Sequence, residues 1–178
     1  MNKRIIQKNH TRILILKTAG KLFRKNGFAS TGIDSIMHKS GLTVGGFYAH
    51  FKSKKDLIKH CLSDIYQNSM STLLMGTSEN PQIKIKQIFK RYLSTYHRDS
   101  KDSCCPLVSI AAELERESKI TSTITKEYLE KFIHEIVLLG LSRQEAIREI
   151  SRNVGALLLS RILKGQSLSD EIINDNQN

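Results

Sequence analysis

The stretch STGIDSIMHKSGLTVGGFYAH, residues 30–50, holds two short helical patterns separated by one break. In its first half, apolar residues stand three or four positions apart, the spacing of one buried helix face: Ile33, Ile36 and Met37. The letters KSGLT interrupt this pattern after about two turns, and Gly41 suits the tight turn. A second short helix is predicted from Val44 to about His50. Two short helices around such a turn are typical of a helix-turn-helix motif.

Residues that favour helix ends bracket this motif. A helix predicted over residues 11–26 ends at Gly27, the residue type that most readily takes up the left-handed backbone of a helix C-terminus. Three polar residues stand where N-caps are expected, two of them three residues before an acid that can complete a capping box: Thr31 (with Asp34), Thr43, and Ser53 (with Asp56). The sequence thus predicts three helices before residue 53.

The rest of the chain also has helical patterns. A long helix is predicted from Lys54 to about Leu74 and is interpreted as a connector that leaves the N-terminal region. Further helices are expected at 83–97, from Pro106 onward, at 121–139 and at 142–164, and the tail DEIINDNQN is expected to fray. No strand pattern is convincing. We therefore predict an all-α protein of about nine helices, divided into residues 1–53, a connector at 54–75, and residues 76–178.

The positive charge is confined to the first third of the chain. Residues 1–60 contain 13 Lys and Arg but only two acids, a net charge of 13 − 2 = +11, whereas residues 61–178 contain 15 of each and are neutral. A basic segment joined to a neutral one indicates a polyanion-binding part on a body with another task. Nucleic acid is the favoured partner, and an anionic membrane surface is the alternative.

A helix-turn-helix places the N-terminal residues of its second helix nearest the base edges of the DNA major groove, here Thr43, Val44, Gly45 and Gly46. Two glycines inside a helix cost about 2 kcal/mol relative to alanine, but they let the backbone approach DNA closely. Val44 and Phe47 are candidates for contact with thymine methyl groups, and a core position is the equal alternative for Phe47. Three further residues are candidates for phosphate contacts: Tyr48, His50 and Lys54.

Residues 15–57, ILKTAGKLFRKNGFASTGIDSIMHKSGLTVGGFYAHFKSKKDL, resemble the DNA-binding domain of the TetR family of bacterial one-component regulators. The similarity includes the Leu-Phe before Gly27, and Phe47-Tyr48, His50-Phe51 and Ser53-Lys54 in the second half. Thr31 matches as well and joins the candidate DNA contacts. Gly46 departs from the family, many members of which carry Thr or Ser at this position.

The resemblance implies a cytoplasmic homodimer that binds a palindromic double-stranded DNA operator. It further implies a C-terminal helical domain for dimerisation and for an unidentified small-molecule ligand, whose binding releases the operator and so relieves repression. In the family the last two long helices form the dimer interface. By resemblance the corresponding apolar residues here are Ile124, Tyr128, Phe132, Ile147, Ile150, Val154, Leu157 and Leu158. The same apolar stripes could instead line a ligand pocket, and dimer or core packing is favoured.

The cysteines raise one alternative function. Cys104 and Cys105 lie near a lysine and directly before Pro106, so a cysteine-based enzyme or thiol sensor with a basic nucleic-acid-binding domain is conceivable. Free cysteines are more often small buried residues, which is also our interpretation of Cys61. We therefore expect no enzyme. The acids at 113, 115 and 117 are expected to form a solvated helix face.

Several classes of protein do not fit the sequence. No apolar run approaches the roughly 18 residues of a membrane span, and the early ILIL run is too short for a signal peptide, so a soluble chain is expected. Three cysteines do not make a disulfide framework and are compatible with a reducing cytoplasm. The six histidines lack paired spacing and no Cys-x-x-Cys occurs, so neither a metal nor a cofactor is expected.

Overall fold

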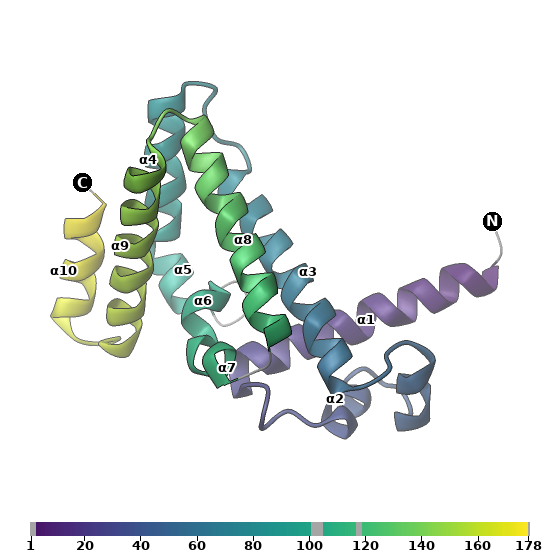
Figure 1. Cartoon of the computed structure of the whole chain (residues 1–178). Helices are drawn as coiled ribbons and strands as arrows, with labels where there is room; N and C mark the ends of the chain where they lie inside the picture. Colours follow the sequence, from purple (N-terminus) through teal and green to yellow (C-terminus); the bar gives the residue numbers. More distant parts are fainter. Residues whose placement is uncertain (1–2, 101–104, 117–118, 178) are drawn as a thin grey trace. The chain divides into compact units, whose positions relative to one another are not determined.

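The computed structural model describes residues 3–100, 105–116 and 119–177, where every regular element is a helix (Figure 1). The prediction of an all-α protein is confirmed: these residues form ten α-helices and one short 3-10 helix, η1. The chain separates into two compact units, Met1–Tyr66 with Ile110–Ile124, and Gln67–Ser109 with Thr125–Asn178. The first unit therefore includes residues 110–124, which the sequence had assigned to the C-terminal part.

The first unit contains the predicted helix-turn-helix. Its elements are α1 (Lys3–Asn26), α2 (Ile33–Lys39), η1 (Val44–Ala49), the first turns of α3 (Lys54–Leu74), α7 (Ala111–Arg116) and the start of α8 (Lys119–Leu138). The predicted bounds of α3 are confirmed. The buried side chains come from every helix of the motif, the largest being Phe23, Phe28, Phe47, Phe51, Ile15, Ile36, Met37, Leu57 and Leu62. Apolar burial of about 25 cal/mol per Å² is the main contribution to this packing.

Some predicted caps of the first unit differ in the structure. The N-cap of α2 is Gly32, without a side-chain hydrogen bond, so the capping box expected from Thr31 and Asp34 is wrong. Thr31 is 1% exposed, and its hydroxyl donates to the carbonyl of Gly27 at 2.7 Å instead. It ties the end of α1 to the start of α2. The cap at Ser53 is confirmed, since its hydroxyl accepts from the amide of Asp56 at 3.1 Å.

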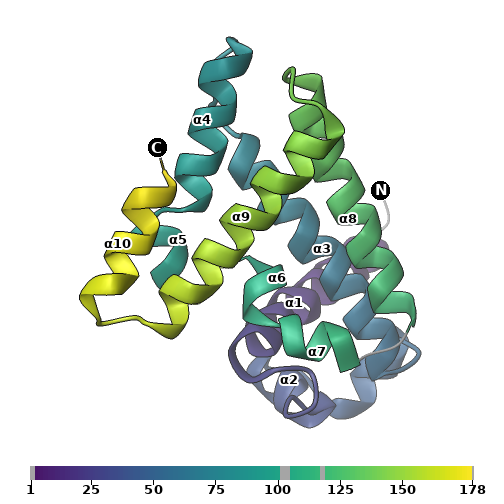
Figure 2. The same cartoon turned by 60° about the vertical axis from the view of Figure 1, so that its left-hand side comes forward.

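The second unit packs α4 (Pro81–Tyr92), α5 (Thr95–Asp99) and α6 (Pro106–Ser109) with the later part of α8, α9 (Arg143–Ile162) and α10 (Ser167–Asn176). Figure 2 shows α10 beside α9. A capping box between Ser142 and Glu145 begins α9, and the Asn80 side chain caps α4. The core is formed by residues such as Ile88, Phe89, Tyr92, Leu93, Phe132, Ile136, Ile150 and Leu157. None of the helices within the described ranges is long and apolar enough to cross a membrane.

The C-terminal tail does not fray as predicted. Residues 167–176 form α10, and Ile173 on it is 1% exposed. The Ser169 hydroxyl donates to the carbonyl of Ser160 on α9 at 2.6 Å, and the Arg98 guanidinium pairs with Asp170. The apolar periodicity of this polar tail is too weak to predict a helix. The helix is stabilised instead by these contacts with α9 and Arg98, which the local sequence does not reveal.

Candidate nucleic-acid interface

The turn between α2 and η1 is built as the sequence predicts. Gly41 has φ +68°, a left-handed conformation that favours glycine, and its amide donates to the carbonyl of His38 at 3.0 Å. The next amide, of Leu42, donates to the carbonyl of Met37 at 2.9 Å. This turn satisfies the last carbonyls of α2 and sends the chain into η1.

The second helix of the motif, predicted from Val44 to about His50, is a 3-10 helix. It covers only Val44–Ala49, and Gly45 and Gly46 at its centre have the lowest helix propensity of any residue except proline. A short segment of this kind readily tightens into 3-10 hydrogen bonding. Thr43 stands at the N-cap position but makes no side-chain capping bond, so the predicted cap is wrong in that respect.

One face of η1 is open to solvent. Val44 is 43% exposed and Tyr48 64% exposed, and Thr43 and Gly45 are also exposed. A Cβ added at Gly45 would meet nothing within 4 Å. These side chains and the bare backbone at Gly45 form a surface that can approach a large partner closely. We call these four residues the η1 face.

Two candidate DNA contacts prove to be buried. Phe47 is fully buried, with its ring 5.2 Å from that of Tyr48 and 5.6 Å from that of Phe51, so the predicted contact between Phe47 and thymine is wrong. It anchors η1 to the core, because a six-residue helix has no other large apolar side chain to bury. Thr31 is buried too and bonded to Gly27, so its side chain is not available for DNA contact.

His50, the C-cap of η1, is held by α1. Nη1 of Arg12 donates to the His50 carbonyl at 2.8 Å, and the Arg12 guanidinium lies 4.4 Å from the centre of the Phe51 ring. Burial, aided by the charges of Lys8 and Arg12, lowers the pKa of His50 below 6.5. In the free chain the neutral imidazole therefore predominates at pH 7.

The start of α3 is less open to a phosphate than the sequence predicted. Lys54 is half-buried, and its ammonium donates to the carbonyl of Ala29 at 3.4 Å. The Asp56 carboxylate accepts from the amide of Lys52 at 3.0 Å, while Ser53 takes the amide of Asp56. The chain's own groups thus occupy the amides of Lys52 and Asp56, although Lys54 keeps unused N–H donors.

Sequence reasoning missed the role of Glu113. Its Oε2 accepts from the amides of Phe28 at 2.5 Å and Ala29 at 3.1 Å, in the turn between α1 and α2. The expectation of a plain solvated face is therefore wrong for Glu113, whereas Glu115 is exposed and Glu117 lies outside the described residues. No local signal in the sequence links positions 85 residues apart. This carboxylate connects α7 to the helix-turn-helix.

Half of the predicted dimer residues are in the core of the second unit. Tyr128, Phe132, Ile150 and Leu157 are at most 5% exposed, so these four predicted subunit contacts are wrong. Ile147 and Leu158 are exposed, and Val154 and Ile124 are half-buried. On α9 the remaining stripe consists of Ile147, Ser151, Val154, Gly155, Leu158 and Ile162, and we call it the α9 stripe.

The cysteines give no support to thiol chemistry. Cys105 is fully buried. Burial raises the pKa of Cys61 to about 12, which keeps its thiol protonated and agrees with its predicted core role. Cys104 lies outside the described residues. Among the described residues, no group of three or more His, Cys, Asp or Glu side chains is placed to hold a metal ion.

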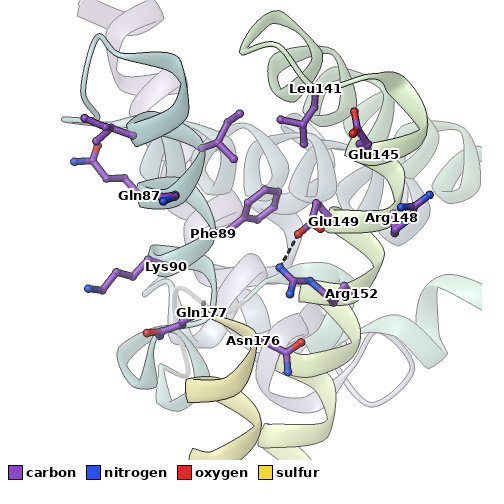
Figure 3. A pocket seen from close by; sticks show the side chains of 13 residues that line it. Gln87, Phe89, Lys90, Leu141, Glu145, Arg148, Glu149, Arg152, Asn176 and Gln177 are labelled. Carbon is purple, nitrogen blue, oxygen red and sulfur yellow. Dashed lines mark hydrogen bonds and ion pairs between the residues drawn. The ribbon is translucent and has the colours of Figure 1, made fainter.

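The second unit has a groove of about 700 Å³ between α4 and α9 (Figure 3). Phe89 and Leu141 supply apolar surface, and the α9 wall is charged. An ion pair of 2.6 Å joins Arg152 to Glu149 there. The remaining lining residues are Ile83, Ile85, Lys86, Gln87, Lys90, Glu145, Arg148, Asn176 and Gln177. The size and the mixed lining are within the range of small-molecule sites.

Comparison with known sequences matches the helix-turn-helix region to one family. Residues 15–61 match the sequence model of the bacterial regulatory proteins of the tetR family. YerO of Bacillus subtilis, an uncharacterized HTH-type transcriptional regulator, is 31% identical over 94 residues, which cover 53% of this chain and 32% of YerO. The transposon Tn10 TetC protein of Escherichia coli is 30% identical over 102 residues, 54% of this chain and 49% of TetC. The chain thus spans less than half the length of these two relatives.

The fold extends the similarity to almost the whole chain. The crystal structure of reduced E. coli NemR has a TM-score of 0.80 at 19% sequence identity, and the alignment covers 94% of this chain and 95% of that one. At this identity the likeness concerns the fold alone. Residues 15–61 thus match the tetR family of bacterial regulatory proteins, and almost the whole chain shares the fold of NemR.

Proposed function

We propose that this protein is a sequence-specific DNA-binding transcriptional regulator, a repressor released from a palindromic operator by a small molecule. The observation that carries the proposal is the exposed η1 face on a well-packed helix-turn-helix. In this reading η1 enters the major groove, where Thr43 and Val44 meet base edges and the bare backbone at Gly45 permits close approach. Tyr48, 64% exposed, contacts a phosphate through its hydroxyl.

A second copy of the chain is the proposed partner of the α9 stripe. Apolar side chains exposed at helical spacing are unusual on a monomer unless they mark an interface, and Ile162 is 70% exposed. Ser151 and Gly155 lie between the larger residues and allow close helix packing. A twofold dimer presents two η1 faces, which corresponds to the two half-sites of a palindromic operator.

The groove between α4 and α9 is the proposed ligand site. It lies in the second unit, where the apolar surface of Phe89 and Leu141 suits the body of a small molecule and the charged rim suits its polar groups. A ligand can release the operator only if it binds the two conformations of the dimer with different affinities. The test begins with compounds selected because they release the wild-type chain from its operator. In a Leu141→Trp variant, whose larger side chain should fill the groove, the operator should still bind normally but these compounds should no longer release it.

Fluorescence anisotropy of DNA binding tests the function. The full chain should select a palindromic duplex from a random-sequence pool and bind it with submicromolar affinity. That affinity should fall steeply as salt rises, because bound phosphates release counterions. Equal affinity for all duplexes would indicate a non-specific architectural protein, and absence of binding at low salt would refute the proposal.

Tyr48→Phe tests the phosphate contact separately. Only a hydroxyl is lost at an exposed position, so the fold should be unaffected, while affinity for every duplex should fall about tenfold. Tyr96→Phe, at a 77% exposed tyrosine of the second unit, is the matched control and should bind as the wild type does. Wild-type affinity in Tyr48→Phe would show that this hydroxyl does not bind a phosphate.

A further inference from the structure

α1 continues for about three turns beyond the packed part of the first unit. Residues 3–10 are all exposed, and the first buried residue of the helix is Ile15. In Figure 1 the N-terminal end of α1 projects away from α2. We call residues 3–12 the α1 arm. An exposed helical end of this kind contributes little to the packing of the core, so its composition is open to another role.

One face of the α1 arm is basic. Arg4, Lys8 and Arg12 are spaced by four residues and therefore lie on the same face of the helix. This row is in line with the buried residues further along α1, Ile15, Ala19 and Leu22. α1 contains no acid, so nothing on the helix itself balances these charges. The face that packs on the core in the C-terminal half of α1 thus becomes a row of positive charge in the N-terminal half.

Contacts of Arg12 fix this row relative to η1. Its guanidinium reaches both the His50 carbonyl at 2.8 Å and the Phe51 ring at 4.4 Å. Lys8 is one turn earlier and close enough to His50 for its charge to help lower the pKa of that imidazole. The row therefore begins beside His50, at the C-terminal end of η1.

We propose that Arg4 and Lys8 bind DNA backbone phosphates beyond those contacted from η1, so that the α1 arm extends the footprint into the sequence flanking each half-site. A rise of about 1.5 Å per residue separates Arg4 from Arg12 by about 12 Å along the helix. Phosphates of one strand recur about every 3.4 Å along the DNA axis, so the row spans several of them. The inference rests on the proposed DNA-binding function and adds contacts that read no bases.

The electrostatics of the α1 arm agree with a polyanionic partner. Like charges four residues apart repel on a helix, and cations near a helix N-terminus are opposed by the helix dipole. Bound phosphates remove both penalties. The opposite face carries Ile6 and Ile13, which are 46% and 50% exposed and would favour an anionic membrane surface. DNA is preferred because Arg12 ties the basic row, and not the isoleucine face, to η1.

The salt dependence of duplex binding tests the inference. The probe is a fluorescent duplex of about 40 base pairs with the sequence selected by the wild-type chain, titrated with sodium chloride. Each lost phosphate contact should reduce the slope of log affinity against log salt by about 0.9, so Lys8→Ala loses about 0.9 and R4A/K8A about 1.8 for each bound arm. Lys17→Ala removes a charge from the isoleucine face of α1 and should keep the wild-type slope.

When the duplex is shortened to the selected site alone, R4A/K8A and the wild type should have the same slope of log affinity against log salt. Circular dichroism of the variants confirms that they are folded. A wild-type slope in R4A/K8A, or an equal loss in Lys17→Ala, overturns the inference while leaving the proposed function intact. The inference is also overturned if the wild-type chain binds phosphatidylserine vesicles and R4A/K8A does not, while the salt slope of duplex binding is the same for both. Failure of the wild-type chain to bind any duplex refutes the proposed function itself.

Discussion

Gly45 allows a direct test of how closely the backbone of η1 approaches DNA. A Cβ there would meet no atom within 4 Å, and the backbone is not left-handed, so alanine fits the fold. Gly45→Ala should therefore raise the free energy of unfolding by about 0.4–1 kcal/mol, because it restricts the unfolded chain. If the backbone of η1 approaches DNA closely, the same methyl group should weaken operator binding about tenfold. Urea unfolding and anisotropy measure the two effects, and a stabilised variant with unchanged DNA affinity would disprove the close approach.

The histidines of the first unit predict a pH dependence of stability. Burial lowers the pKa of both His50 and His60 below 6.5 in the folded chain. Below pH 6.5 the unfolded state therefore binds more protons than the folded state, and stability should fall as the pH drops from about 7 to about 5. The urea midpoint should decrease over this range, and His50→Gln should reduce the decrease. His134→Gln, at an exposed position of α8, controls for the replacement itself; if it has the same effect as His50→Gln, the explanation is wrong.

At the scale of helices, Glu113 makes α7 part of the helix-turn-helix unit. Glu113→Ala leaves the amides of Phe28 and Ala29 without their carboxylate acceptor, which should cost about 1–3 kcal/mol of stability. Glu115→Ala, at an exposed neighbour on the same helix, should change stability by less than about 0.5 kcal/mol. Chemical denaturation of the two variants makes the comparison. Equal stability of the two would mean that the contact contributes nothing.

Individual helices differed in how well the sequence predicted them. α3 was predicted with its observed bounds, Lys54–Leu74, because its apolar spacing is regular and Ser53 supplies a clear cap. α10 was missed because Ser169 and Asp170 are held by Ser160 and Arg98, partners that are distant in the sequence. Local patterns thus predict a helix when its own residues specify it, and they fail when remote contacts do.

For the whole molecule, dimerisation through the α9 stripe is the main prediction. Leu158→Asp should place an unpaired charge in an apolar interface and weaken the dimer by about 3 kcal/mol, or roughly a hundredfold. Sedimentation velocity over a concentration series measures the change. Met75→Asp, at a 69% exposed position outside α9, is the control and should leave self-association unchanged. A Leu158→Asp chain that associates like the wild type would exclude this stripe as the interface.

The sequence by itself determined the all-α class, the helix-turn-helix and the basic character of its first third, because periodicity, capping residues and charge are local properties of the chain. Only the tertiary structure decided which candidate residues are accessible. Phe47 and Thr31 belong to the same motif as Tyr48, yet they are buried while Tyr48 is exposed. A helical pattern shows that a residue lies on an apolar face, but not whether that face meets its own core or a partner. On α9 the sequence pattern likewise could not distinguish buried Leu157 from exposed Leu158. Which of the two is buried depends on packing between segments that are distant in the sequence.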